Sequence, residues 1–292
     1  MTAPIVKWAG GKGKLVPAIL ARAPQVFGTF HEPFLGGGAV FFGLCREGRL
    51  HRACLNDLNP DLVDTYRAVR DAPNLIIEEL QQLSNCYLSR PHEDRAALYY
   101  QVRAAKPHVG PALAAWLLFL NKTCYNGLFR VNRRGEFNVP HGDYVNPRIL
   151  DRDALLRASR CLQRAEIVSE DFGDACKRAQ PGDFVYLDPP YQPLTSTANF
   201  TSYTSVEFGE DEQIRLRDEF EALTTRGAAA ILSNSSHRLI SDLYEGRGYS
   251  VEEVFMARAI NSAGQGRSPV PELLISNLSR PEVIQAFSSS PK

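Results

Sequence analysis

The chain has 292 residues, of which 44% are hydrophobic and 23% are charged, and its formal net charge is zero. This composition is ordinary for a globular protein, and the neutral balance excludes nucleic-acid binding through overall positive charge. The longest apolar run, residues 112–120, is about half as long as the ~20 residues that a membrane helix needs. Because the N-terminus also lacks the apolar core of a signal peptide, we expect a cytoplasmic protein without membrane association.

Cysteine spacing gives no sign of a metal centre. None of the six cysteines forms a Cys-x-x-Cys pair, and no His/Cys cluster has ligand spacing. We therefore expect reduced thiols that pack as small residues, and no structural metal. The six are Cys45, Cys54, Cys86, Cys124, Cys161 and Cys176.

A glycine-rich loop with three lysines and an indole stands near the start, at residues 7–14 (Lys-Trp-Ala-Gly-Gly-Lys-Gly-Lys), and residues 15–23 are expected to form a helix. Glycines let the backbone approach a ligand closely, and lysines beside a helix N-terminus favour an anion. The spacing is not that of a P-loop. Taken alone, the loop is more typical of a solvated turn.

Residues 30–42 combine a short strand, three glycines (36–38) and an apolar segment that would form the following helix. This order is typical of nucleotide-type sites, although the strict Gly-x-Gly-x-x-Gly spacing is absent. A second strand, 53–55, leads to Asp57, roughly 20 residues beyond the glycines, where an acid commonly accepts hydrogen bonds from ribose hydroxyls. The alternative is that Asp57 caps the helix beginning near Pro60, but the spacing favours ribose binding.

Residues 61–106 and 112–120 have helical patterns with no strand between them, and the second is apolar nearly all round, which predicts burial. The alternation of strands and helices seen in the flanking segments is therefore interrupted. We expect a discontinuous catalytic domain, residues 1–60 and 148–292, with an inserted helical domain at 61–147.

The helical part ends in two short segments, 128–131 and 136–139, that would pair as a hairpin around Asn-Arg-Arg-Gly. A projecting ribbon with basic and amide side chains suits reading of the DNA major groove and contact with phosphates. The alternative is a solvated hairpin with a basic tip. Charge alone does not decide, because Glu136 and Asp143 dilute the basic character.

After Pro147 the α/β rhythm resumes. We expect a mobile loop over the site at 194–203 and a disordered tail after Phe287. The expected helices are 155–162 and 213–223, and the expected strands are 166–168 (ending at Glu170-Asp171-Phe172), 184–187, 228–232 (ending at Ser233-Asn234-Ser235), 249–255 and 272–276.

The strand at 184–187 ends at Asp188-Pro189-Pro190-Tyr191. Two prolines make the turn rigid, and it carries a carboxylate and an aromatic ring at the edge of the sheet where ligands bind in α/β proteins. Such a turn suits a planar group that bears an amine. By itself the motif is equally compatible with a proline turn whose tyrosine covers the core.

Together these motifs resemble the Dam-type DNA adenine methyltransferases, the D12 class of group alpha. Each motif alone is weak, but their order is highly specific, and the resemblance extends from Lys7 to Leu274. The motifs are Lys7-Trp8-Ala9-Gly10-Gly11-Lys12, Glu32-Pro33-Phe34-Leu35-Gly36-Gly37-Gly38, Asn56-Asp57-Leu58-Asn59, Tyr125-Asn126-Gly127-Leu128-Phe129-Arg130, Gly135-Glu136-Phe137-Asn138-Val139-Pro140 and Asp188-Pro189-Pro190-Tyr191.

The resemblance implies a Rossmann-like sheet that binds S-adenosylmethionine (AdoMet), interrupted by a helical target-recognition domain whose hairpin, 128–140, binds double-stranded DNA, usually at adenine in GATC or a related site. It implies no metal. By matching position, it implies catalytic roles for Asp188, Pro189 and Tyr191, and cofactor contacts for Trp8, Lys12, Phe34, Gly36, Gly38, Asp57, Asp171, Phe172 and Asp188. It implies DNA contacts for Lys7, Asn126, Leu128, Arg130, Pro140 and Tyr144, to which the basic hairpin tip adds Arg133 and Arg134. Asp143 departs from the pattern, because relatives can carry a basic residue there.

The implied mechanism begins with an adenine that flips out of the duplex and stacks on Tyr191. Its amine would donate to the Asp188 carboxylate and the Pro189 carbonyl, Lys12 would meet the methionine carboxylate of AdoMet, and the amine would attack the methyl group in line. The alternatives are an acceptor in cytosine, RNA or protein, a non-catalytic DNA-binding relict, and a nicotinamide oxidoreductase. We expect a monomer, and the sequence leaves open whether it works alone or beside a cognate restriction endonuclease.

Overall fold

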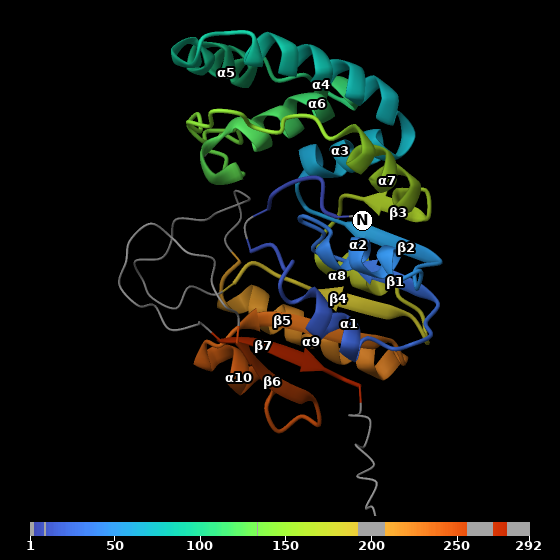
Figure 1. The fold of residues 1–292 in the computed structure, drawn as a ribbon. Coiled ribbons are helices and arrows are strands. Elements are labelled where there is room, and N and C mark those ends of the chain that lie inside the picture. Colours follow the sequence, from blue (N-terminus) through green and yellow to red (C-terminus); the bar gives the residue numbers. More distant parts are fainter. Residues whose placement is uncertain (1–2, 9, 133, 192–207, 256–270, 279–292) are drawn as a thin grey trace, which may run out of the picture.

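The computed structural model describes residues 3–8, 10–132, 134–191, 208–255 and 271–278 (Figure 1). In these residues, seven strands form one sheet with the order β3-β2-β1-β4-β5-β7-β6. β7 is antiparallel to both neighbours, and the other pairs of adjacent strands are parallel. The strands are β1 (Thr29–Glu32), β2 (Arg52–Asn56), β3 (Ala165–Val168), β4 (Phe184–Leu187), β5 (Ala229–Ser235), β6 (Ser250–Phe255) and β7 (Pro271–Ser276). The expected α/β class and Rossmann-like sheet are confirmed.

The central strand β4 is buried on both faces, which is why it reads as a continuous apolar run. Phe184 and Tyr186 join one hydrophobic cluster, whereas Val185 and Leu187 join the other. The first cluster includes residues of α1 (Val16–Arg22), α2 (Ala39–Arg46), α3 (Pro60–Asp71) and α7 (Arg152–Leu162). The second includes residues of α8 (Phe172–Lys177), α9 (Glu210–Arg226) and α10 (Arg238–Tyr244). The sheet is therefore the middle layer of three.

The segment between β2 and β3 is helical, as its apolar pattern predicts. Figure 1 shows α4 (Pro73–Leu88), α5 (Arg95–Ala104) and α6 (Gly110–Thr123) together beyond the sheet, next to α3. The short turns η1 (His92–Asp94) and η2 (Tyr125–Gly127) lie beside them. Residues 113–120 of α6 are all buried, which confirms the expected burial of residues 112–120 except at Ala112, which is exposed. No helix in the described ranges is long and apolar enough to cross a membrane.

The expected strands and longer helices are found within a few residues of their predicted bounds. α8 and α10 were not predicted, because helices this short leave little periodicity. The expected hairpin at 128–140 is less regular than predicted: Val131 and Phe137 form an isolated bridge, and Asn138 N–H donates to the Arg130 carbonyl at 3.0 Å. The expected loop at 194–203 and the tail after Phe287 lie outside the described residues.

The expectation of six reduced cysteines is wrong for two of them. Cys45 of α2 and Cys161 of α7 form a disulfide, with α-carbons 6.2 Å apart and a sequence separation of 116. The two helices pack against each other, and this packing brings together thiols that no sequence spacing relates. Cys54, Cys86, Cys124 and Cys176 are free, and all except Cys86 are buried.

Counting thiols tests the disulfide. Alkylation of the denatured protein should find four thiols before reduction and six after it. In the Cys45→Ser variant, the count should be the same before and after reduction. Six thiols in the unreduced native chain would contradict the bond.

At the opposite end of β4 from the expected catalytic turn, a buried pair joins this strand to β1. His31 Nε2 lies 3.0 Å from Asp183 Oδ2, and the same carboxylate accepts hydrogen bonds from the backbone N–H of Thr29 (2.7 Å) and Gln180 (2.9 Å). Burial lowers the pKa of His31 despite its acidic partner. Burial acts to raise the pKa of Asp183, but these hydrogen bonds outweigh it and leave the pKa below its usual range. The pair therefore consists of an ionised aspartate and a neutral histidine near neutral pH.

Asp183→Asn should lower the free energy of unfolding by about 1–3 kcal/mol near neutral pH, because the amide cannot satisfy all three donors. Urea unfolding followed by circular dichroism measures this change. The wild-type protein should also lose stability as the pH falls from about 7 to about 5, because unfolded His31 takes up a proton that its lowered folded pKa disfavours. An unfolding free energy that is unchanged in Asp183→Asn would contradict the role of the pair.

Candidate active site

Several polar side chains meet at one edge of the sheet. The carboxyl ends of β1, β2, β4 and β5 lie at this edge, and so does the start of β7, because that strand runs in the opposite direction. The order of the strands reverses between β1 and β4, which is where open α/β sheets bind their ligands. The polar residues at or next to these strand ends include Glu32, Asp57, Asp188, Ser233 and Glu272.

Asp188 immediately follows β4 and is held through a single carboxylate oxygen. Lys12 Nζ lies 3.0 Å from Oδ1, and the Ser233 hydroxyl donates to the same oxygen at 3.0 Å. The Tyr186 hydroxyl lies 2.8 Å from Ser233 Oγ and extends the network into the core. Burial raises the pKa of Asp188, and the Lys12 ammonium opposes it without cancelling it. The carboxylate is therefore fixed by two donors from different elements.

Lys12 is the centre of this cluster, with only 4% of its side chain exposed. Besides Asp188, it donates to the Gly10 carbonyl at 3.0 Å and lies 3.6 Å from Glu272 Oε2. Its ammonium is 4.2 Å from the centre of the Tyr191 ring, at cation–π distance. The Tyr191 hydroxyl donates to Glu272 Oε2 at 2.6 Å. The structure thus brings Lys12, Asp188 and Tyr191 together, as predicted, and adds Ser233 and Glu272, which sequence reasoning missed.

Two further hydrogen bonds connect the proline turn to α9 and β5. Gln213 of α9 donates to the Pro190 carbonyl at 3.2 Å, and Asn234 of β5 donates to the Gln213 side chain at 2.9 Å. Gln213 and Asn234 are fully buried. Burying two amides costs free energy unless both are hydrogen-bonded. The presence of Gln213 and Asn234 was therefore the signal available in the sequence, but the sequence does not show that these two side chains bond to each other.

The glycine turn after β1 is organised by Asp57. The backbone N–H of Gly36 donates to Asp57 Oδ2 at 2.9 Å, and that of Asn59 donates to Oδ1 at 2.9 Å. Gly36 has φ +47°, and a Cβ there would lie 2.8 Å from the Trp8 ring. The cap of α3 is Asn59 rather than Asp57. Burial raises the pKa of Asp57, and the two backbone donors oppose it.

A cluster of three phenylalanine rings lies beside this turn. Phe34 packs on Phe172 with ring centres 5.3 Å apart, and Phe208 contacts both. The Arg215 guanidinium lies 4.0 Å from the centre of the Phe172 ring and pairs with Asp171, which also caps α8 through Gly173 N–H. Phe34 and Phe172 are therefore together, as the resemblance implied, while the Asp171 carboxylate is engaged by Arg215.

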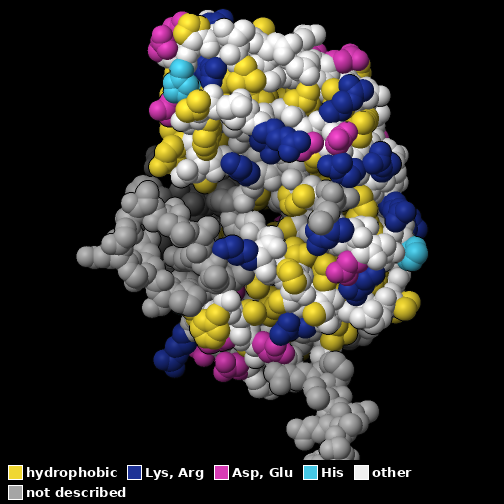
Figure 2. Space-filling model, viewed as in Figure 1, with side chains coloured by type: hydrophobic (Ala, Val, Ile, Leu, Met, Phe, Trp, Pro, Cys, Tyr) yellow, Lys and Arg dark blue, Asp and Glu magenta, His cyan; other side chains and the backbone are white. Residues whose placement is uncertain are grey.

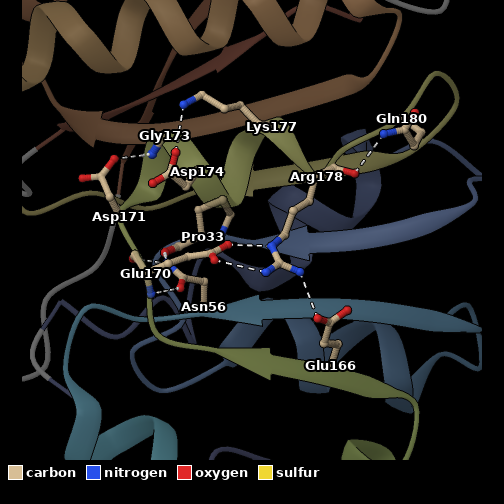
Figure 3. A network of polar contacts seen from close by, with 10 residues as sticks. All are labelled: Pro33, Asn56, Glu166, Glu170, Asp171, Gly173, Asp174, Lys177, Arg178 and Gln180. Atoms are coloured by element: carbon tan, nitrogen blue, oxygen red, sulfur yellow. Dashed lines mark hydrogen bonds and ion pairs between the residues drawn. The ribbon is translucent and has the colours of Figure 1, made fainter.

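Figure 3 shows how side chains connect the ends of β1, β2 and β3. The Asn56 side chain donates to the Pro33 carbonyl (2.9 Å) and exchanges hydrogen bonds with the backbone of Glu170 (3.1 and 2.9 Å). Arg178 holds the Glu170 carboxylate through two nitrogens and reaches Glu166 of β3. This frame fixes the spacing of the three strand ends.

The N-terminal loop joins the sheet edge to the helical part. Lys7 exchanges backbone hydrogen bonds with the Asn121 side chain of α6 (2.7 and 2.8 Å), and Asn121 also donates to the Gly127 carbonyl. Trp8 stacks on Phe129 with ring centres 4.9 Å apart. The Lys7 ammonium lies 5.8 Å from the centre of the Tyr144 ring. Residues predicted to touch the cofactor and residues predicted to touch DNA are thus adjacent here.

The other predicted DNA contacts lie around the hairpin. Arg130, Arg134, Pro140 and Asn126 are exposed, and Leu128 is half-buried. Arg130 is held by Asn138, through Nε to Oδ1 at 2.7 Å and Nη2 to the carbonyl at 3.3 Å. Arg133 lies outside the described residues. Tyr125, which sequence reasoning did not single out, is 55% exposed beside Asn126, whose φ is +56°.

Figure 2 shows Lys and Arg side chains gathered across the middle of the face seen in Figure 1, between the upper helices and the lower strands. A neutral chain can therefore still present a local basic surface. In the described ranges, no group of three or more His, Cys, Asp or Glu side chains has the arrangement of a metal site.

Comparison with known sequences identifies the family of this chain. The family described as D12 class N6 adenine-specific DNA methyltransferase matches residues 8–259. The type II methyltransferase M.MjaIII of Methanocaldococcus jannaschii is 40% identical over 94% of this chain and 98% of its own length. The type II methyltransferase M1.LlaDCHI of Lactococcus lactis subsp. cremoris is 37% identical over 94% and 95%. The DNA adenine methylase of Escherichia coli K12 is 35% identical over 92% and 93%.

Matches of this extent decide among the alternatives that the sequence left open. They favour adenine in DNA over a cytosine, RNA or protein acceptor, and an enzyme over a DNA-binding relict or an oxidoreductase. The chain belongs to the D12 class of N6-adenine-specific DNA methyltransferases.

Proposed function

We propose that the enzyme takes the methyl group from AdoMet and transfers it to an adenine that has flipped out of GATC, or a related short site, in double-stranded DNA. The observation that carries this proposal is the orientation of Asp188. Lys12 and Ser233 both contact Oδ1. Among the described residues, Oδ2 is then the oxygen that an incoming N–H group reaches without displacing either contact.

The acidic character of the sheet edge supports a cationic cofactor. Burial, and then repulsion by Asp188 and Asp57, raises the pKa of Glu32 well above its usual range. A positive charge placed here would relieve that repulsion. When bound, AdoMet supplies a methyl group on a positively charged sulfonium, which suits this edge. Trp8, Phe34 and Phe172 offer aromatic surface beside the glycine turn of Gly36 and Gly38, and the Asp57 oxygens retain acceptor capacity for ribose hydroxyls.

The contacts of Lys12 point to a role that differs from the family expectation. The resemblance implied that Lys12 meets the methionine carboxylate, but its ammonium contacts Asp188, the Gly10 carbonyl and Glu272. An ammonium has three donors, and these partners already lie around it. We therefore propose that Lys12 acts mainly by holding Asp188.

Methyl transfer then depends on how the turn holds the amine. The adenine would stack on Tyr191 and donate one amine N–H to Asp188 Oδ2 and the other to the Pro189 carbonyl. These bonds draw the nitrogen lone pair out of conjugation with the ring and aim it in line at the methyl group. The new N–C bond would form as the bond between methyl carbon and sulfur breaks, and the sulfur would leave as a neutral thioether. Burial raises the pKa of Asp188, so its carboxylate is suited to accept the proton that the amine loses.

Duplex DNA would contact the hairpin and the N-terminal loop. Arg130 is braced by Asn138, and a guanidinium held in one orientation suits bidentate recognition of guanine in the major groove. Arg134, Arg133, Lys7, Asn126, Leu128, Pro140 and Tyr144 complete the proposed surface. Tyr125 adds an exposed ring of the kind that can insert between bases.

The setting proposed for the enzyme follows from its substrate. A DNA substrate supports a cytoplasmic location. The contacts described here apply equally to an enzyme that works alone and to one that protects sites from a restriction endonuclease.

Asp188→Ala should lower the rate of methyl transfer by at least about a hundredfold, because the amine loses a preorganised charged acceptor. Binding of the GATC duplex should stay within about threefold, since Asp188 does not lie on the proposed duplex-binding surface. Transfer of labelled methyl groups and a filter-binding assay measure the two effects. The matched control is Asp183→Asn, at the opposite end of β4, which should keep its activity at temperatures where it is folded. Near-normal turnover by Asp188→Ala would reject the assigned role.

Arg130→Ala should weaken the preference for the target over a site with one altered base pair by about 1–3 kcal/mol, the typical value of a bidentate guanine contact. Arg134→Ala, at the hairpin tip, should instead weaken binding to all sequences similarly and lower the salt dependence by about one phosphate contact. Competition binding at several salt concentrations separates the two results. If Arg130→Ala loses affinity equally for all DNA sequences, Arg130 contacts phosphate rather than guanine.

A further inference from the structure

A second carboxylate, Glu272, reaches the catalytic turn from a strand that is distant in the sequence. Glu272 lies near the start of β7, where it pairs with Ser235 of β5 and Val254 of β6. Because β7 is antiparallel to β5, its start lies at the same edge as Asp188. The Glu272 side chain is only 18% exposed.

One oxygen of Glu272 joins two parts of the site. Oε2 accepts the Tyr191 hydroxyl at 2.6 Å and lies 3.6 Å from the Lys12 ammonium, which in turn lies 3.0 Å from Asp188. Burial, and then the nearby carboxylates, raises the pKa of Tyr191, so the phenol keeps its proton and acts as the donor. The Tyr191 ring also lies under the ammonium. Tyr191, Glu272, Lys12 and Asp188 thus form a connected set.

This arrangement fixes the Tyr191 ring relative to the Asp188 carboxylate, and the two groups must contact the same adenine. The base would stack on the Tyr191 ring while its amine reaches Asp188. Rotation of the ring by a few degrees moves the stacked amine relative to the carboxylate, and errors of about 1 Å in a reacting group are costly. Glu272 anchors the far end of the ring, at the hydroxyl, and it does so relative to the same ammonium that fixes Asp188.

We propose that Glu272 is a positioning residue for methyl transfer. It acts through the Tyr191 hydroxyl, with support from Lys12, and sets the plane of the stacking ring relative to the Asp188 carboxylate. This inference rests on the roles proposed above for Asp188 and Tyr191.

Glu272→Gln tests the inference in the full-length enzyme, because it keeps the size of the side chain and a neutral acceptor while it removes the charge. The single-turnover rate at saturating AdoMet and GATC duplex should fall about tenfold or more, because the weaker acceptor lets the ring move. The Kd for AdoMet and for the duplex should each change by less than about threefold. The matched control is Glu253→Gln, an exposed glutamate on the adjacent strand β6, which should stay within about twofold of the wild-type rate.

Tyr191→Phe tests the same hydrogen bond from its other end without altering β7. If both residues act through this bond, the double variant Glu272→Gln/Tyr191→Phe should be no more than about threefold slower than the slower single variant. If the contribution of Glu272 were merely structural, the rate losses caused by Glu272→Gln and by Tyr191→Phe would instead multiply in the double variant.

The inference is overturned if Glu272→Gln transfers methyl groups within about threefold of the wild-type rate, or if the two losses multiply in the double variant. Asp188→Ala, assayed in parallel, separates this failure from failure of the proposed function. An active Asp188→Ala variant rejects the proposed site. An inactive Asp188→Ala variant beside a normal Glu272→Gln variant rejects only the role of Glu272.

Discussion

The ion pair between Lys12 and Asp188 is the interaction on which the candidate site depends. Its ammonium comes from a loop near the N-terminus and its carboxylate from the turn after β4. Ser233 on β5 and Glu272 on β7 extend the pair, so that three strands and the loop are fixed together. Breaking a largely buried pair by removing one partner typically costs about 3–5 kcal/mol, because the remaining charge stays unsolvated. The cluster therefore restricts how far the turn from Asp188 to Tyr191 can move.

The same loop joins the edge of the sheet to the helical segment and the hairpin. Lys7 is tied to Asn121 of α6, and Trp8 stacks on Phe129 at the start of the hairpin while it lies against the Gly36 turn. Binding of DNA at the hairpin and binding of a cofactor at the glycine turn would therefore act on neighbouring residues. Because Gly36 and Trp8 are closely packed, neither the glycine turn nor the N-terminal loop can shift far without the other.

Much of this arrangement could be predicted from the sequence, and the remainder could not for identifiable reasons. Apolar runs indicated the strands, and the turn from Asp188 to Tyr191 indicated the candidate site, because strand ends and proline turns are local signals. Glu272 was missed because its contact with Tyr191 spans 81 residues and depends on the reversed direction of β7. The Cys45–Cys161 disulfide was missed for the same reason, since packing of α2 on α7 creates it. Asp57 and Asn59 were close enough in sequence to be considered together, but only the structure assigns the helix cap to Asn59.

The most direct test of the central claim is methyl transfer from labelled AdoMet into two matched duplexes, one with GATC and one with that site scrambled, followed by identification of the labelled base. We expect the label to be recovered as N6-methyladenine from the GATC duplex and not from the scrambled one. Label recovered on cytosine, or equally from both duplexes, would contradict the proposed acceptor or the proposed specificity.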